Sequence, residues 1–81
     1  MSLGYSQQLV EANRRADKTK KSMGVALGRE CIKASIPVIT VAQQLGVSRT
    51  TLYNWFVGAS LPKERYVHAI IDFMSSMKKR R

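Results

Sequence analysis

A group of polar side chains in the middle of the chain has the chemical types that contact nucleic acids. The group comprises Ser48, Arg49, Thr50, Thr51, Tyr53 and Asn54, and none of them is acidic. Arginine can donate two hydrogen bonds to guanine, asparagine can pair in a similar way with adenine, and threonine can contact a thymine methyl group or a phosphate. The pattern predicts a surface that reads bases in a DNA major groove. The alternative interpretation is a polar helix face that only contacts solvent.

No other set of residues has the spacing that catalysis or metal binding requires. The sequence contains no metal-ligand spacing, no glycine-rich phosphate loop and no paired carboxylates. Cys31 is the single cysteine, so no internal disulfide can form, and its apolar neighbours favour a buried, reduced thiol. A catalytic pair of Cys31 and His68 is the alternative, but no nearby residue would orient the two groups. We therefore expect a protein that is not an enzyme and that needs no cofactor or metal.

The polar residues are predicted to lie on the second of two short helices that a tight turn connects. The first helix should end at Gly46, because glycine readily adopts the left-handed conformation that terminates a helix. The second should begin after Ser48, whose hydroxyl can cap it. Apolar residues recur at helical spacing on both sides of the turn and would face the core: Val41, Ala42, Leu45, Leu52, Trp55 and Phe56. This arrangement predicts a helix-turn-helix.

Length and charge narrow the classes of partner. The chain has 81 residues and a formal net charge of +9, from 14 basic and 5 acidic side chains. A chain of this length forms one small domain with a marginal core, which favours compact helical packing or dimerisation. The charge predicts attraction to a polyanion, with nucleic acid preferred over an anionic membrane. No apolar run approaches the roughly 20 residues of a membrane span and no secretory signal is recognisable, so we expect a cytoplasmic protein.

The residues before the helix-turn-helix divide into a basic segment and an amphipathic helix. The basic segment, residues 1–21, ends in the run Arg14, Arg15, Lys18, Lys20 and Lys21. It forms either a short helix or a loose arm, and such an arm would either bind phosphates and a minor groove or remain a solvated terminus. Ser22 then caps a helix that extends to about Ala34, within which Gly24 and Gly28 could permit close helix packing.

Two prolines mark the remaining helix boundaries. Pro37 ends the preceding helix, and the next one begins either at Pro37 or at Thr40, which has capping-box spacing to a glutamine. A last helix is expected from Pro62 to Met77, followed by a basic tail at residues 78–81. The broad apolar stripe of that helix either closes the core or provides a dimer surface.

The expected fold class is therefore all-α, a compact bundle of four to five helices. Its helix-turn-helix domain would span residues 22–77, between the basic segments at residues 1–21 and 78–81.

The central residues also form a pattern with specific spacing: Ala42, Leu45, Gly46, Val47, Ser48, Arg49, Leu52, Trp55, Gly58 and Pro62. This pattern resembles the lambda-repressor and Cro-type helix-turn-helix family, over roughly residues 23–74. The resemblance implies a lambda-repressor-like bundle in which Arg49, Thr50 and Asn54 read bases, with Tyr53 on the same face. It also implies that phosphates are approached by Ser48, Thr51 and the loop from Gly58 to Lys63, including Ser60.

Two positions depart from the family pattern. Many relatives place an arginine in the first helix opposite a glutamate at the end of the base-reading helix, and the corresponding residues here are Cys31 and Phe56. We expect an apolar contact there in place of an ion pair. Relatives often begin the second helix with a glutamine that binds phosphate, and that position here is Val38. This phosphate contact must come from backbone N–H groups or from elsewhere.

The leading hypothesis is a sequence-specific regulator that binds double-stranded DNA. Members of the family usually bind palindromic operators as dimers and repress phage or plasmid promoters, so the resemblance implies a small Cro-like repressor that is a homodimer and occludes a promoter. No second domain is evident, so no small-molecule ligand is expected, and no membrane is expected as a partner. One alternative is a helical protein–protein adaptor that has kept the fold. The other is an architectural DNA-binding protein without sequence preference, driven by the basic ends.

Overall fold

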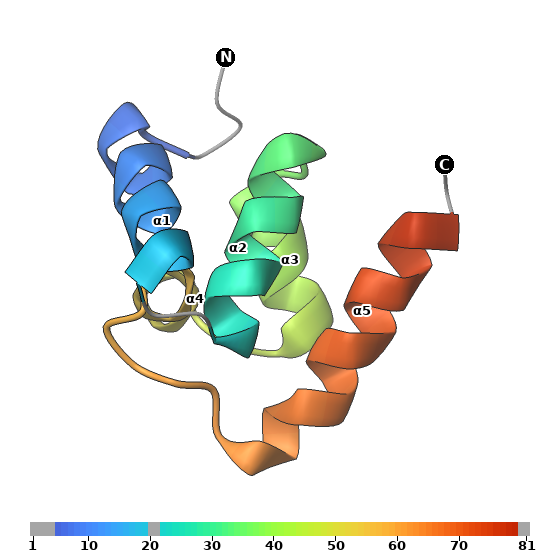
Figure 1. Ribbon diagram of the computed structural model, residues 1–81. Helices are drawn as coiled ribbons and strands as arrows, with labels where there is room; N and C mark the ends of the chain where they lie inside the picture. The colour runs from blue at the N-terminus through green and yellow to red at the C-terminus, as the bar shows by residue number, and fades with distance from the viewer. Residues whose placement is uncertain (1–4, 20–21, 80–81) are drawn as a thin grey trace.

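The computed structural model describes residues 5–19 and 22–79, which form a helical bundle without a β-strand (Figure 1). The elements are α1 (Gln7–Thr19), α2 (Met23–Lys33), α3 (Val38–Leu45), α4 (Arg49–Phe56), the 3₁₀ turn η1 (Glu64–Tyr66) and α5 (Val67–Lys79). Helix α2 lies between α1 and α5 and packs against α4 (Figure 1). The predicted all-α fold class is confirmed, with five α-helices in the described part of the chain.

The helix-turn-helix boundaries follow from local interactions. Gly46 has the left-handed backbone angles φ 71° and ψ 35° and ends α3. The Ser48 side chain accepts a hydrogen bond of 3.1 Å from the Thr51 N–H and thereby caps α4. Ser22 caps α2 in the same way by accepting a bond of 3.2 Å from the Val25 N–H. The predictions for Gly46, Ser48 and Ser22 are thus confirmed.

The sequence did not determine where two of the helices begin, and the structure gives both positions. Helix α3 begins at Val38 with Pro37 as its N-cap residue, so Thr40 lies inside the helix and forms no capping box. The last helical segment does not begin at Pro62, because the chain remains extended through Lys63 before η1 and α5 follow. That extended stretch carries the chain from the end of α4 to the far side of the bundle, where α5 starts (Figure 1). The predicted start of this helix was therefore too early.

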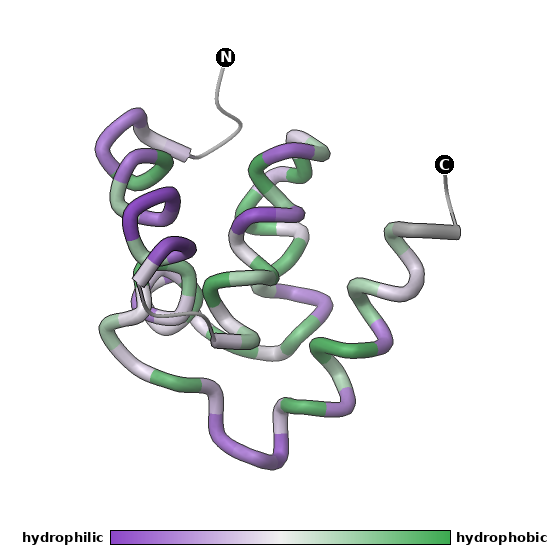
Figure 2. The backbone as a smooth tube through the Cα atoms, viewed as in Figure 1, coloured by the Kyte–Doolittle hydropathy of each residue, from purple (hydrophilic) through white to green (hydrophobic). Residues whose placement is uncertain are grey.

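The core is built from the apolar faces that helical spacing predicts. The apolar side chains that are 0% exposed come from α2, α3, α4 and α5: Val25, Leu27, Cys31, Val41, Leu52, Phe56 and Ile70. Cys31 and Phe56, for which an apolar contact is expected, both belong to this core. Hydrophobic residues recur along α2 to α5, whereas α1 is mainly hydrophilic (Figure 2). Helix α1 packs against α2 but supplies few large apolar side chains to the core.

Residues 7–19 of the basic segment form a packed helix, α1, which is one of the two alternatives that the sequence allowed. Tyr5, just ahead of α1, is 2% exposed, and the centre of its ring lies 6.0 Å from that of Phe56. Asn13 and Ala16 are buried further along the helix. Of the predicted basic run and tail, Lys20, Lys21, Arg80 and Arg81 lie outside the described residues, and Lys78 and Lys79 end α5.

Two glycines of α2 allow α4 to come unusually close. A Cβ atom added to Gly24 would lie 2.8 Å from the Cβ of Trp55, and one added to Gly28 would lie 2.6 Å from the Cγ of Phe56. Carbon atoms do not approach one another so closely, so only glycine leaves enough room for α4. Gly24 and Gly28 therefore permit the close packing of α2 and α4, a role that the sequence had left open for them.

Replacing Gly28 with alanine should lower the free energy of unfolding by about 1–3 kcal/mol, even though alanine favours helices by about 1 kcal/mol. The added methyl group would overlap Phe56 and lie 2.8 Å from the Nδ2 atom of Asn13. Urea denaturation followed by circular dichroism measures the change. Ser35→Gly is a control of opposite sign: Ser35 has φ 56°, and a left-handed backbone costs a residue with a side chain about 1 kcal/mol. A Gly28→Ala protein as stable as the original would contradict the packing argument.

Candidate nucleic-acid interface

The outward face of α4 begins at a hydroxyl cap. The Ser48 hydroxyl accepts a hydrogen bond from the Thr51 N–H and donates one of 3.0 Å to the Thr51 Oγ1, so Thr51 keeps its own hydroxyl hydrogen for another acceptor. N–H groups at the start of a helix lack acceptors within it and carry the positive end of the helix dipole. The first turn of α4 contains no acidic residue. This end of the helix is therefore suited to an anion.

Three of the four predicted base-reading residues share one exposed surface. Arg49, Thr50 and Asn54 are exposed, and the spacing of four between Thr50 and Asn54 places them one above the other. Tyr53 is half-buried, and beside it a hollow separates α4 from the start of α1. The opposite side of α4 is enclosed, since Leu52 is 0% exposed. Neither the core nor another helix of the described chain covers the Arg49 and Asn54 side.

The loop after α4 turns back toward the same helix. Gly58 has a positive φ of 77°, and the N–H groups of Ala59 and Ser60 donate to the carbonyl oxygen of Asn54 at 2.9 and 3.3 Å. These bonds attach the loop to α4 at the level of a predicted base-reading residue. Ser60 and Lys63, the predicted phosphate contacts of the loop, are both exposed. The structure thus brings Ser60 close to the end of α4, and Lys63 follows in the extended segment before η1.

The inner side of the loop is anchored by aromatic packing. The ring of Trp55 lies 5.3 Å from that of Tyr66 in η1, with a tilt of 57°. Arg65 lies 5.0 Å from the centre of the same tyrosine ring and donates a hydrogen bond of 3.1 Å to its hydroxyl. Such tilted aromatic pairs and cation–π contacts stabilise a surface by about 1 kcal/mol each. They hold the two ends of the Gly58 to Lys63 loop.

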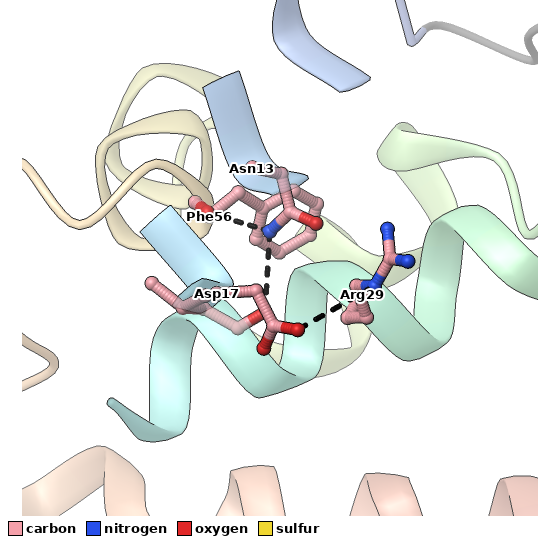
Figure 3. Close-up of polar contacts among 5 residues, drawn as sticks. Asn13, Asp17, Arg29 and Phe56 are labelled. Carbon is pink, nitrogen blue, oxygen red and sulfur yellow. Dashed lines mark hydrogen bonds and ion pairs between the residues drawn. The ribbon is translucent and has the colours of Figure 1, made fainter. Parts of the chain in front are cut away.

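The helix-turn-helix stretch carries basic side chains and no acidic ones. No acidic side chain occurs between Cys31 and Lys63 in the sequence, a stretch that includes all of α3 and α4. The ion pair between Asp17 of α1 and Arg29 of α2, at 3.8 Å, lies outside this stretch and is partly exposed to solvent (Figure 3). An anion that approached α4 would meet no opposing carboxylate from the same segment, so the sum of charges favours binding of a polyanion.

Sequence reasoning missed Asn13, the buried residue that connects α1 to α2 and α4. Its Nδ2 donates to the carbonyl oxygens of Phe56 and Val25 at 2.7 and 3.2 Å (Figure 3). Phe56 ends α4, where carbonyl groups lack intrahelical donors, so Asn13 satisfies a group that the helix itself leaves unpaired. The available signal was a polar residue at helical spacing from Leu9 and Ala16 on the less polar side of α1.

The single thiol is enclosed and protonated. Cys31 is 0% exposed, and burial, followed by the nearby charge of Glu30, raises its pKa to about 12. Burial also raises the pKa of Tyr5 above its usual range, with the neighbouring Cys31 as the second cause. A protonated, enclosed thiol is a poor nucleophile, while His68 is exposed on α5. The prediction of a buried, reduced Cys31 agrees with this geometry.

Features outside the α4 surface give little indication of function. Within residues 5–19 and 22–79, no cluster of three or more His, Cys, Asp or Glu side chains could hold a metal ion. Nor does that part of the chain contain a helix long and apolar enough to cross a membrane.

Comparisons with protein-family models, with curated proteins and with solved structures found no match. The functional argument therefore rests on the geometry and charge around α4.

Replacing Asn13 with alanine should lower the free energy of unfolding by about 1–3 kcal/mol, because two buried carbonyl groups would lose their donor. Chemical denaturation monitored by tryptophan fluorescence measures the loss, since Trp55 lies in the packed helix. Asn54→Ala removes the same amide from an exposed position and should change the stability by less than about 0.5 kcal/mol. Equal effects of the two substitutions would show that Asn13 does not hold the helices together.

Proposed function

We propose that this protein is a transcriptional regulator that binds double-stranded DNA with sequence specificity. It would be a small Cro-like repressor that occludes a promoter. The observation that carries the proposal is the exposed face of α4. This face presents Arg49, Thr50 and Asn54 on a helix that Ser48 caps, within a segment free of acidic side chains. A short helix with such a face has the shape and hydrogen-bonding groups to enter a major groove.

Affinity and specificity would come from different residues. Arg49 is the candidate for guanine and Asn54 for adenine, because both side chains can form bidentate hydrogen bonds with those bases, and Thr50 is the candidate for a thymine methyl group. The candidate phosphate contacts surround them: Ser48, Thr51, Ser60 and Lys63. Phosphate contacts fix the register of the protein on the duplex, and base contacts select the sequence.

Repression by occlusion is best served by a symmetric homodimer. Two copies of α4 about 34 Å apart would meet successive major grooves on one side of a palindromic operator. Helix α5 offers a surface for the second copy: Ile71 is 45% exposed, and a groove of about 340 Å³ between α5 and α3 is lined in part by Phe73 and Met77. The cytoplasm of a bacterial cell, where such promoters are found, is the corresponding location.

The same groove supports a second candidate function, a helical adaptor that binds a protein through α3 and α5. Phe73 and Met77 give this groove an apolar side on α5, and Ile36 and Leu45 add apolar side chains from the other side. The net charge of +9 and the exposed Arg49 favour DNA over this alternative. A salt titration separates the two, because binding to DNA weakens steeply as salt rises and adaptor function predicts no such DNA affinity.

Selection from random duplex DNA should yield a palindromic sequence, and Arg49→Ala should weaken binding to it by about 1–3 kcal/mol and relax the preference at one base pair. The reason is the loss of two hydrogen bonds to one base, and a fluorescence-anisotropy titration against duplexes with single base changes measures both effects.

Lys63→Ala is the matched control, because it removes a positive charge from the loop rather than from α4. It should weaken binding to all sequences alike and leave the base preference unchanged. If Arg49→Ala left both affinity and preference intact, α4 would not be the element that reads the DNA.

A further inference from the structure

A hollow of about 430 Å³ lies where the start of α1 meets α4. Its walls are formed by Ser6, Gln8 and Leu9 on one side and by Tyr53, Asn54 and Val57 on the other. Asn54 is also part of the face proposed to read bases. The hollow is therefore a continuation of that face and extends it onto α1, a helix that carries none of the residues behind the proposed function.

The walls of the hollow have two chemical characters. Leu9, Tyr53 and Val57 are half-buried, and together they provide an apolar floor. Ser6, Gln8 and Asn54 are exposed and form a polar rim. The Ser6 oxygen accepts a hydrogen bond of 3.1 Å from the Leu9 N–H, which leaves its hydroxyl hydrogen for another acceptor, and the Gln8 amide has two donors of its own. An apolar floor beneath hydrogen-bond donors matches a deoxyribose ring that carries a phosphate.

The side of α1 that borders the hollow carries two charged residues of opposite sign, Glu11 and Arg15, and both are exposed. Gln8 and Arg15 are seven residues apart, so they lie on the same side of the helix at a separation of about 10 Å along its axis. Asp17 lies on a different side of α1, where it pairs with Arg29 of α2 at 3.8 Å. Glu11 lies on the same flank between Gln8 and Arg15. The flank next to α4 therefore presents hydrogen-bond donors at its start and a cation at Arg15, and a phosphate would be placed at these two ends and not beside Glu11.

We propose that this flank of α1 binds the sugar–phosphate backbone of the DNA strand that borders the groove read by α4. The hollow receives a deoxyribose, Ser6 and Gln8 donate hydrogen bonds to the attached phosphate, and Arg15 neutralises a phosphate further along the strand. The role is independent of sequence and positions α4 in the groove. The inference rests on the proposed function, because this flank meets a backbone only when α4 lies in a major groove.

The test compares adjacent glutamines that differ only in their direction. Gln7 and Gln8 are both exposed in the first turn of α1, but a turn of about 100° separates them and only Gln8 lines the hollow. Gln8→Glu should lower the affinity for duplex DNA about tenfold, because a carboxylate would face a phosphate. Gln7→Glu adds the same charge away from the hollow and should change the affinity less than about twofold. The probes are a duplex selected by the original protein and the same duplex with its sequence shuffled.

A second pair of variants tests the charge on the flank. Arg15→Ala should reduce the slope of log affinity against log salt by about one, as expected for one lost phosphate contact. Arg14→Ala removes an exposed arginine from a different side of α1 and should leave the slope nearly unchanged. Circular dichroism checks that all four variants retain the helical content of the original protein.

The outcomes separate this inference from the function on which it rests. Equal losses for the two glutamine variants, or for the two arginine variants, would overturn the role of the α1 flank while leaving the base reading by α4 intact. A Gln8→Glu protein with altered base preference would overturn the backbone assignment, because Gln8 would then contact bases. If the original protein bound neither probe, the proposed function would fail first.

Discussion

Helix α4 can contribute to the core and still present a face to solvent because α2 has no side chains at two successive turns. Any Cβ atom at Gly24 or Gly28 would come within 2.8 Å of atoms of Trp55 or Phe56, so α4 lies directly against the backbone of α2. That contact fixes the rotation of α4 about its own axis. A shift of one residue would turn the helix by about 100° and carry its outward residues into the core. The geometry of the whole candidate interface therefore depends on the missing side chains of a neighbouring helix.

The buried amide of Asn13 also fixes the C-terminal end of α4, but one of its own polar atoms remains unpaired. Its Nδ2 bonds two carbonyl groups, but its Oδ1 is buried without a hydrogen-bond partner in the described structure. Because an unpaired buried acceptor offsets part of the gain from the two bonds, the net stabilisation is smaller than the number of bonds implies. The amide selects one register of α1 against α2 and α4, because its donors reach the carbonyl groups of Phe56 and Val25 only in that register. The position of α1, a largely hydrophilic helix, is thus fixed by this polar interaction together with the apolar contacts of Tyr5 and Ala16.

The sequence predicted the features that depend on near neighbours and missed those that depend on distant ones. Gly46 and Ser48 act within a few residues, so the turn and the start of α4 followed directly from residue type. Outward exposure of Arg49 followed from helical spacing alone. The docking of α1 did not, because Asn13 reaches a carbonyl group 43 residues away and its own helix has only a weak apolar stripe. The start of the last helix was misplaced because Pro62 is equally compatible with a first helical turn and with an extended chain.

The position of α1 also connects the stability of the protein to its charge. Lys18 lies three and four residues after Arg15 and Arg14 on α1, and like charges at these spacings repel and weaken a helix, while Glu11 at the same spacings before the two arginines offsets part of this repulsion. In the free protein the remaining repulsion opposes the contacts that hold α1 against α2 and α4, and the net charge of +9 adds to it. A bound polyanion would remove the repulsion, so ligand binding and the docking of α1 would favour each other. Helix α1, which joins the core through Tyr5, Asn13 and Ala16 and carries exposed cations on its outer side, would then be stabilised by a bound nucleic acid.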